Sequence, residues 1–251
     1  MKTADGQIVV SSSQSQDIYD ELKDIQSHIL SLSGAVSNWP SVATLSRPTL
    51  ARILNLNSLY DLIIGRTGVI CEFGVHYGSS LATLLNLRSI KEPYNYSRTL
   101  FGFDTFEGFV GSKSEDGTAV KDGDFKLGQS YEKLLERLLT LHEKLSPNAH
   151  IKKFQIYKGN AGETVRAWLE EHPYALVAMA IFDMDIYKPT KDVLEAILPR
   201  LTKGSVLVFD ELNCQHFPGE TLALMEVLDI HKLKLMQSPL LPFTSYTVFG
   251  E

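Results

Sequence analysis

Apolar side chains recur at helical spacing near the start of the chain. Five of them lie three or four positions apart: Ile18, Leu22, Ile25, Ile29 and Leu32. This spacing predicts an amphipathic helix over residues 16–33, which could pack on the rest of the chain or on a second subunit. A second helix is expected between Pro48 and Gly65. The polar, Ser-rich residues 1–15 are expected to be disordered or loosely attached.

From residue 68 onward, short apolar runs alternate with amphipathic segments. Strands are expected at five of these runs: 68–73, 99–103, 151–158, 175–182 and 205–209. Helices are expected between and after them: one through Leu81, Leu84 and Leu85, then 131–145, 163–171, 189–198 and 220–228. Strands that alternate with helices in this way favour a parallel sheet with helices on both faces.

Two further strands are expected at the end of the chain, 232–237 and 245–249, with no helix between them. Parallel neighbours need a long crossover connection, so this pair should be antiparallel. The predicted fold class is therefore α/β. We expect a doubly wound, Rossmann-like sheet of seven mostly parallel strands with a C-terminal antiparallel strand, preceded by N-terminal helices.

Residues 107–130 are polar and Gly-rich. A loop of this length inside a compact domain is usually functional or disordered. The segment could close over a bound molecule and exclude water. Its lysines, Lys113, Lys121 and Lys126, could meet an anionic substrate, although a solvated loop is the favoured interpretation of these charges.

Composition and charge narrow the classes of partner. The formal net charge is -6 at pH 7 and no basic stripe stands out, so a nucleic-acid partner is not expected. The longest apolar stretch, 174–182, is too short to span a membrane, and the polar start does not resemble a signal peptide. A cytoplasmic protein without a membrane partner is therefore expected. Cys71 and Cys214 lack a metal-type spacing and are expected to be reduced, buried thiols.

The end of the first expected strand has the composition of a ligand-binding turn. In an open parallel sheet, ligands bind beyond the carboxyl ends of the strands. Gly74 permits a sharp turn and a close approach to the backbone, and the N–H groups after Gly78 can hold the carboxylate of an amino-acid ligand. Glu72 can attract the ammonium of that ligand, and His76 is expected to shape the pocket. The candidate binding residues are Glu72, Gly74, Val75, Gly78, Ser79 and Ser80. An ordinary Gly-containing turn is the alternative.

The next two strand ends suit the nucleoside part of such a ligand. Asp104 follows the second strand, where an acid can bind ribose hydroxyls, and Thr105 and Phe106 come next, with Phe106 at the border of an adenine. Three small or polar residues follow the third strand: Gly159, Asn160 and Ala161. Their size leaves room for the adenine ring. A helix cap at Asp104 and an ordinary turn at the third site are the alternatives.

Carboxylates gather at the ends of the fourth and fifth expected strands. Asp183 and Asp185 follow the fourth strand, and Asp210 and Glu211 follow the fifth. These strands should be neighbours, so the acids should lie close together, and such a cluster is tolerable only with a cation or a proton among them. Hard oxygen ligands suit Mg²⁺, Mn²⁺ or Ca²⁺. Solvated acids at the starts of loops are the alternative.

Three stretches of the chain resemble the macrocin O-methyltransferase family, metal-dependent enzymes that methylate sugar hydroxyls of antibiotics and related glycosides. They are VICEFGVHYGSSLATL, LFGFDTFEGF and IFDMDIYKPTKDVLEAILPRLTKGSVLVFDEL. The resemblance runs from about residue 48 to 250. It implies a class I methyltransferase domain over residues 48–251 after a tail and helical extension at 1–47. It also implies S-adenosylmethionine as cofactor, a divalent cation, expected to be Mg²⁺, and a sugar, glycoside or nucleotide sugar as the small-molecule acceptor.

By this resemblance, three side chains are the metal ligands: Asp183, Asp210 and Glu211. Asp183 would also border the cofactor, and Asp185 would bind the metal through water or brace Tyr187. The chain departs from the family at two places. Glu211 stands where an aspartate is usual, and the helix after the fourth strand starts at residues 188–190 without the usual acid and Ser-Thr.

The implied reaction needs a way to activate the acceptor. A sugar hydroxyl is barely ionised at neutral pH, and a bound divalent cation would lower its pKa. A base would accept the proton, a step worth roughly 10²–10⁴-fold in rate. Asp183 is the first candidate, as ligand and possible base. His216 is the rival base, or else a loop histidine with no role.

Three other functions stay open on the sequence. The enzyme could methylate a catechol or another non-sugar acceptor, a fold relative could act as a hydroxylase, or a non-catalytic protein could keep the cofactor pocket and regulate a partner. The full set of acids argues against the last, because unpaired carboxylates are costly to keep without a ligand. A homodimer or higher homo-oligomer is expected, with the helix at 16–33 as a candidate contact.

Overall fold

The computed structural model describes residues 13–32 and 39–250. The chain divides into two compact units, Met1–Ile53 and Leu54–Glu251. The tail predicted at 1–15 lies largely outside the described residues, and the domain boundary predicted at residue 47 stays a prediction. No helix in the described ranges is both long enough and apolar enough to cross a membrane.

The first unit consists of helices. They are α1 (Ser13–Leu32), α2 (Trp39–Ala43) and the first turns of α3 (Arg47–Ile63). The helix predicted at 16–33 therefore begins slightly earlier, and its last position falls outside the described residues. The hydrophobic pattern did not predict the short α2. α3 begins with a cap, because the Ser46 hydroxyl accepts the Thr49 N–H at 3.4 Å.

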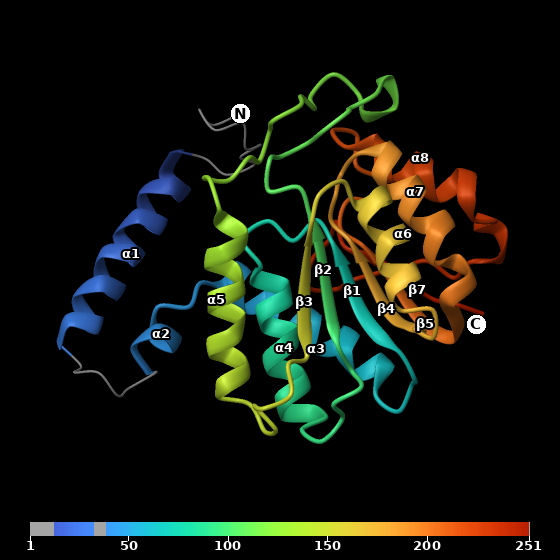
Figure 1. Cartoon of the computed structure of the whole chain (residues 1–251). Helices are drawn as coiled ribbons and strands as arrows, with labels where there is room; N and C mark the ends of the chain where they lie inside the picture. Colours follow the sequence, from blue (N-terminus) through green and yellow to red (C-terminus); the bar gives the residue numbers. More distant parts are fainter. Residues whose placement is uncertain (1–12, 33–38, 251) are drawn as a thin grey trace. The chain divides into compact units, whose positions relative to one another are not determined.

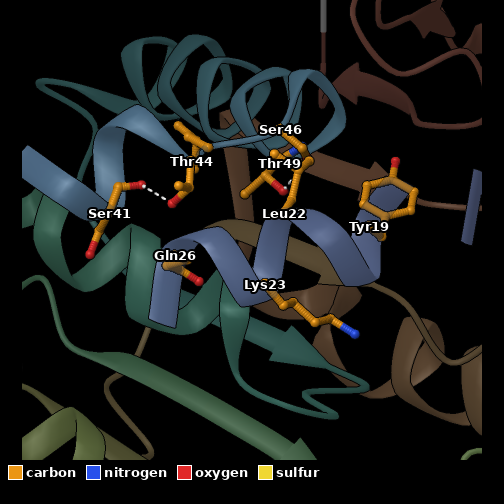
Figure 2. Close-up of a pocket in the computed structure, with 9 residues that line it drawn as sticks. Tyr19, Leu22, Lys23, Gln26, Ser41, Thr44, Ser46 and Thr49 are labelled. Carbon is orange, nitrogen blue, oxygen red and sulfur yellow. Dashed lines mark hydrogen bonds between the residues drawn. The ribbon is translucent and has the colours of Figure 1, made fainter. Parts of the chain in front are cut away.

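A hollow lined by both polar and apolar side chains lies among α1, α2 and the start of α3 (Figure 2). Its volume of about 270 Å³ lies below the range of about 300–1,000 Å³ typical of ligand pockets. Its hydroxyls bond locally: Thr44 Oγ1 donates to the Ser41 carbonyl at 3.5 Å, and the Ser46 and Thr49 hydroxyls are 2.9 Å apart. We therefore interpret this hollow as a surface irregularity of the helical unit.

The second unit is built on one seven-stranded sheet (Figure 1). Its strands are β1 (Val69–Phe73), β2 (Leu100–Asp104), β3 (Phe154–Lys158), β4 (Val177–Phe182), β5 (Leu201–Phe209), β6 (Met236–Gln237) and β7 (Ser245–Val248). Their order is β3-β2-β1-β4-β5-β7-β6. β1 to β5 pair in parallel, and β7 is antiparallel to both β5 and β6. The predicted α/β class, with its antiparallel final strands, is confirmed.

Helices cover both faces of this sheet (Figure 1). The second half of α3, α4 (Ser79–Lys91) and α5 (Tyr131–Lys144) pack on one face, and α6 (Ala161–Glu171), α7 (Tyr187–Ile197) and α8 (Pro218–Val227) on the other. Each face has its own apolar cluster, because successive strand side chains point to opposite faces. Ile70 thus joins the first cluster and Cys71 the second.

Two predictions near the C-terminus need correction. The strand predicted at 232–237 is reduced to the two residues of β6. Before it, Asp229 accepts a backbone N–H at 3.2 Å and caps a 3-10 turn, η4 (Ile230–Lys232), which competes with an extended conformation.

Both cysteines are free, but only Cys71 is buried; Cys214 is half-buried in the loop after β5.

The last row of residues before the carboxyl edge of the sheet is aromatic. Five rings on neighbouring strands form this row, in sheet order Tyr157, Phe103, Phe73, Phe182 and Phe209. Adjacent rings are stacked, with centroids 4.8–5.5 Å apart. Such stacked pairs contribute roughly 0.5–1.5 kcal/mol each beyond their buried area. The row lies on the face covered by α6, α7 and α8 and stiffens the sheet below its carboxyl edge.

A buried arginine holds together the opposite edge of the sheet. Arg98 is 1% exposed. Its guanidinium donates to the carbonyl oxygens of Ile63 at 3.0 Å, Arg66 at 2.7 Å and Gly68 at 2.5 Å, and Nε contacts Glu92 at 3.0 Å. These bonds join the end of α3 to the start of β1. Burial alone would raise the pKa of Glu92, but hydrogen bonds led by that from Arg98 outweigh it and lower the pKa.

Candidate active site

Backbone hydrogen bonds align the strand ends at the carboxyl edge of the sheet. The N–H groups of Gly159, Gly74, Asp183 and Asp210 donate to the carbonyl oxygens of Asp104, Phe103, Phe73 and Phe182, at 2.9, 2.9, 2.8 and 3.1 Å. Each donor stands one residue beyond its strand. The candidate residues at the ends of β1, β2, β3, β4 and β5 therefore lie along one edge, as the parallel arrangement predicts.

The turn between β1 and α4 is tightly built. Gly74 has φ 88°, and a Cβ at this position would overlap the Asp183 carbonyl oxygen, so only glycine lets the ends of β1 and β4 approach this closely. Gly78 is the N-cap of α4, with φ 78° and no side-chain cap bond to the first turn. Glu72 and Ser80 are buried, whereas Ser79 is exposed. The first turn of α4 thus presents N–H groups beside a buried acid.

Asp104 braces this turn. Its Oδ2 accepts the His76 N–H at 2.7 Å, and its Oδ1 accepts the Phe106 N–H at 2.6 Å. Each carboxylate oxygen can accept a second hydrogen bond, so a ligand hydroxyl could still bind. Burial lowers the pKa of the His76 imidazole, and the Asp104 carboxylate partly opposes this shift. Thr105 closes its own turn by donating to the Gly108 carbonyl at 2.8 Å.

The turn after β3 is largely committed to starting a helix. Asn160 is the N-cap of α6, and its side-chain oxygen accepts the Gly162 N–H at 2.9 Å. Ala161 is buried, and Gly159 has φ 144°. The ordinary-turn interpretation therefore accounts for the Asn160 side chain, while the small size of its neighbours is still compatible with the predicted adenine site.

Acidic side chains follow β4 and β5 side by side. Asp183 and Asp210 occupy equivalent positions, since Phe182 pairs with Phe209 in the register of these strands. The Thr244 hydroxyl donates to Asp210 Oδ1 at 2.8 Å and orients that carboxylate. Burial raises the pKa of Asp185 well above its usual range, and the charges of Glu211 and Asp210 raise it further. The acids of the two strand ends therefore influence each other strongly.

A further acid, Glu220, belongs to this group and was not predicted. It lies in the first turn of α8 and is 0% exposed. Burial raises the pKa of Glu220 well above its usual range, followed by the charges of Asp185, Asp210 and Asp183. A helix N-terminus stabilises a negative charge by about 0.3–1 kcal/mol, whereas burial of a carboxylate costs several kcal/mol. Glu220 follows Pro-Gly at the start of a predicted helix, where an acid is normally expected at the surface because it complements the helix dipole. The sequence therefore does not indicate that this side chain is buried.

The acids have the chemistry of a cation site without a formed coordination sphere. Across the part of the chain that the structure describes, no three His, Cys, Asp or Glu side chains are grouped so as to hold a metal ion. The available atoms are hard carboxylate oxygens, which suit Mg²⁺ or Mn²⁺. One of them, Glu220 Oε2, is buried without a hydrogen-bond partner. In donor chemistry, though not in preformed geometry, the residues fit a divalent cation.

The two candidate histidines lie in different surroundings. His216 is exposed in the loop between β5 and α8, and its role as rival base stays a prediction. The half-buried His76 packs against aromatic rings, with its centroid 4.0 Å from that of Tyr77 and 6.0 Å from that of Phe125. The expected part of His76 in shaping a pocket stays a prediction.

Backbone strain is concentrated in the segments that follow the strands. Among the described residues, seven non-glycine residues have positive φ. Six of them follow β1, β2, β4 or β5 before the next long helix begins: His76, Phe106, Phe125, Ser130, Asp185 and Asn213. Such conformations cost of order 1–3 kcal/mol each and are kept most often at functional sites. Their position agrees with a site at this edge of the sheet.

The segment 107–130 is an ordered loop that folds back on itself. The Phe109 N–H donates to the Asp124 carbonyl at 3.0 Å, and the Gly123 N–H donates to the Phe109 carbonyl at 2.9 Å. The loop contains a short 3-10 helix, η2 (Ser114–Asp116). Three apolar side chains of the loop are buried, Phe109, Val120 and Leu127, whereas Val110 is exposed. The segment is therefore a folded loop in this structure, and its functional role stays a prediction.

One buried carboxylate ties this loop to the helix after β4. Asp116 is 0% exposed, and its two oxygens accept the N–H groups of Tyr187 at 2.5 Å and Lys113 at 2.6 Å. Tyr187 is the first residue of α7, so Asp116 acts as a helix cap supplied from a distant part of the chain. Asp116 also touches Gly219, where a Cβ would overlap its Oδ1.

Replacing Asp116 with alanine should loosen the loop. The lost cap should lower the free energy of unfolding by about 1–2 kcal/mol, in the range of other helix caps. Amide hydrogen exchange in residues 107–130 should become faster, because the loop loses its link to α7. Asp122→Ala is the matched control: Asp122 accepts the N–H groups of Gly111 and Ser112 but is exposed and bonds only within the loop. Equal exchange in wild type and Asp116→Ala would contradict this role.

Comparison with known proteins adds the family to this geometry. A family model described as a methyltransferase domain matches residues 71–212. The chain is similar to the crystal structure of CalS11, calicheamicin methyltransferase, with 33% identity over 100% of both chains and a TM-score of 0.89. It is also similar to apo CalS11, described as TDP-rhamnose 3'-O-methyltransferase of calicheamicin biosynthesis, with 32% identity over 97% of both chains and a TM-score of 0.81.

A more distant likeness supports the fold alone. The O-methyltransferase NovP is 14% identical, with 93% of this chain and 98% of that chain covered and a TM-score of 0.60. A comparison with curated proteins found no match. The class I fold implied by the three sequence stretches is thus confirmed over the whole second unit.

Proposed function

Since the chain belongs to the family of methyltransferase domains and is an enzyme that takes methyl groups from S-adenosylmethionine, we propose that its acceptor is a hydroxyl group of a sugar. The observation that carries this proposal is the 33% identity over the full length of both chains with CalS11. CalS11 is described as acting on TDP-rhamnose, so a nucleotide sugar is the first acceptor to consider here. A glycoside of a natural product is the second.

We assign the cofactor to the turn between β1 and α4 and to the two neighbouring strand ends. The N–H groups at the start of α4 lack a side-chain cap and can bind the methionine carboxylate. Glu72, buried one residue before the end of β1, can attract the ammonium group. The remaining lone pairs of Asp104 can accept the ribose hydroxyls, and the small residues after β3 can border the adenine.

We assign a divalent cation to Asp183, Asp210 and Glu211, the three acids that the family resemblance indicates. The hard oxygens of these side chains and their neighbours suit Mg²⁺. When bound, such an ion would lower the pKa of an acceptor hydroxyl. Thr244 would hold the Asp210 carboxylate in place through its 2.8 Å hydrogen bond. The Gly74 turn, which touches the Asp183 carbonyl, would set the distance between cofactor and acids.

The chain's own residues would then position a displacement reaction. S-adenosylmethionine, held by the turn after β1 and by Asp104, would supply an electrophilic methyl group to the acceptor oxygen, and its sulfur would keep the electron pair of the broken carbon–sulfur bond. The hydroxyl proton would pass to the Asp183 carboxylate, with His216 as the rival acceptor. The turn after β1 and the acids after β4 would align oxygen, carbon and sulfur, and this orientation would lower the barrier to the reaction. The loop 107–130 would keep water out while the reactants are held.

The exposed apolar stripe of α1 bears on the expected oligomer. Ile18 is 55% exposed, Ile25 43% and Leu32 71%. A homodimer in which this stripe meets a second copy stays a prediction, and light scattering of the full chain would test it.

The proposed function is tested by binding first and by turnover second. Titration calorimetry should show micromolar binding of S-adenosylmethionine and of its demethylated product. Mass spectrometry should then show a methylated product with TDP-rhamnose, when Mg²⁺ is present. A folded sample that binds neither cofactor form would overturn the methyltransferase assignment. Methylation of a catechol, but of no sugar or nucleotide sugar, would overturn the acceptor assignment and leave the cofactor site intact.

A further inference from the structure

Glu220 occupies a place where a carboxylate needs a partner. It stands in the first turn of α8, next to Gly219, which touches both Asp116 and the Asp185 carbonyl. The Glu220 side chain is completely buried. This position puts its carboxyl group close to the residues that follow β4 and β5.

The protein itself satisfies this side chain only in part. Glu220 Oε1 accepts the Glu211 N–H over a long distance of 3.5 Å, and Oε2 has no hydrogen-bond partner. Among the ion pairs of the described residues, none includes Glu220. Its charged neighbours are Asp183, Asp185 and Asp210, all of the same sign. Burial without a partner is costly for a polar oxygen and more so for a charged one.

We propose that Glu220 is a ligand of the divalent cation, in addition to Asp183, Asp210 and Glu211. This inference rests on the proposed function, because it assumes the cation assigned there. A cation between α8 and the strand ends would give Oε2 the partner that it lacks. It would also balance acids from three elements, β4, β5 and α8, whereas the ligands assigned from the family resemblance come from β4 and β5 alone.

Adding Glu220 does not by itself give a formed coordination sphere. Within the described residues, neither the acids after β4 and β5 alone nor these acids together with Glu220 are grouped so as to hold a metal ion. A cation that also binds Glu220 would draw the first turn of α8, and the loop that precedes it, toward the strand ends. The site would then be completed by the ion, and α8 would be the element that responds to it.

The test measures Mn²⁺ binding, by the loss of the electron paramagnetic resonance signal of free Mn²⁺, in the full chain. Glu220→Gln keeps the shape and removes the charge. We expect its affinity for Mn²⁺ to fall at least about tenfold, as for other changes around metal sites. Its affinity for S-adenosylhomocysteine, measured by calorimetry, should not change. Glu226→Gln is the matched control on the same helix, because Glu226 is exposed and pairs with Lys191.

Thermal unfolding gives a second readout that does not depend on activity. Without metal, Glu220→Gln should be at least as stable as wild type, because a buried, partly unsatisfied acid is removed. With saturating Mn²⁺, the Tm of wild type should rise while that of the variant rises less, since a ligand stabilises the state that binds it. Glu220→Asp, which keeps the charge, should recover part of the response.

Each outcome has a distinct meaning. Equal Mn²⁺ binding by wild type and Glu220→Gln would overturn the role of Glu220 and leave the cation in place. A wild type that binds S-adenosylhomocysteine but no Mn²⁺ would overturn both this role and the cation, and leave the cofactor assignment standing. A wild type that binds neither would overturn the proposed function itself.

Discussion

Changing Asp183 to asparagine is expected to lower kcat by about 10²–10⁴-fold, the range of a lost catalytic base. The side chain keeps its size, so the backbone contact between residue 183 and Gly74 should survive. S-adenosylmethionine should therefore bind as in wild type. Product formation with the nucleotide sugar measures kcat, and calorimetry measures the affinity for the cofactor. A metal ligand and a base differ further: extra Mg²⁺ should restore part of the turnover only if Asp183 acts as a ligand.

The control for this prediction is Glu195→Gln on α7, an exposed acid that forms a 3.9 Å ion pair with Lys191 in the same helix. Its turnover should equal that of wild type. Full activity of Asp183→Asn would show that the acids after β4 do not serve the reaction.

The largest change in stability should come from Arg98→Ala. The buried Arg98 guanidinium donates hydrogen bonds to three backbone carbonyl oxygens and forms an ion pair with Glu92. Removing it leaves these carbonyl oxygens without their donor, and it leaves the Glu92 carboxylate with only the Tyr60 hydroxyl and the Asn95 amide as hydrogen-bond donors. The loss of one member of a buried pair typically costs about 3–5 kcal/mol. Denaturation by urea should show this as a lower midpoint with a similar slope.

Arg137→Ala provides the comparison for Arg98, because Arg137 is an exposed arginine on α5. Its change should lie within about 0.5 kcal/mol of wild type. If Arg98→Ala unfolds at the same urea concentration as wild type, the bonds from Arg98 do not hold α3 to β1.

The sheet could be predicted from the sequence because its strands are short, apolar and separated by helices. Val177–Phe182 is buried at every position, which is why its composition predicts a central strand. The end of the chain was less predictable. A two-residue strand such as β6 has too few positions to show a pattern, and the local cap at Asp229 outweighs the strand propensity of the residues after it.

The sequence predicts which residues lie at the site better than it predicts the contacts that these residues make. The positions of the acids after β4 and β5 could be inferred from the strand ends, which parallel pairing brings to one edge. The roles of Asp116 and Glu220 depend on contacts with elements far away in the chain, and a single sequence carries no signal for such contacts. Asn160 is the opposite example. It is a small polar residue at a strand end, which suggested a binding pocket, yet its side chain caps α6.

The aromatic row beneath the site has a consequence for how the acceptor range can change. Stacked rings from Tyr157 to Phe209 form a floor that belongs to the strands, whereas the residues above it belong to loops. Substitutions in those loops can alter which sugar fits without disturbing the core that supports the acids. Directed evolution of this enzyme should therefore vary the exposed residues of 107–130 and 212–217, and leave unchanged the five rings and the buried Asp116. We expect natural relatives with other acceptors to differ in these loops and to keep the aromatic row.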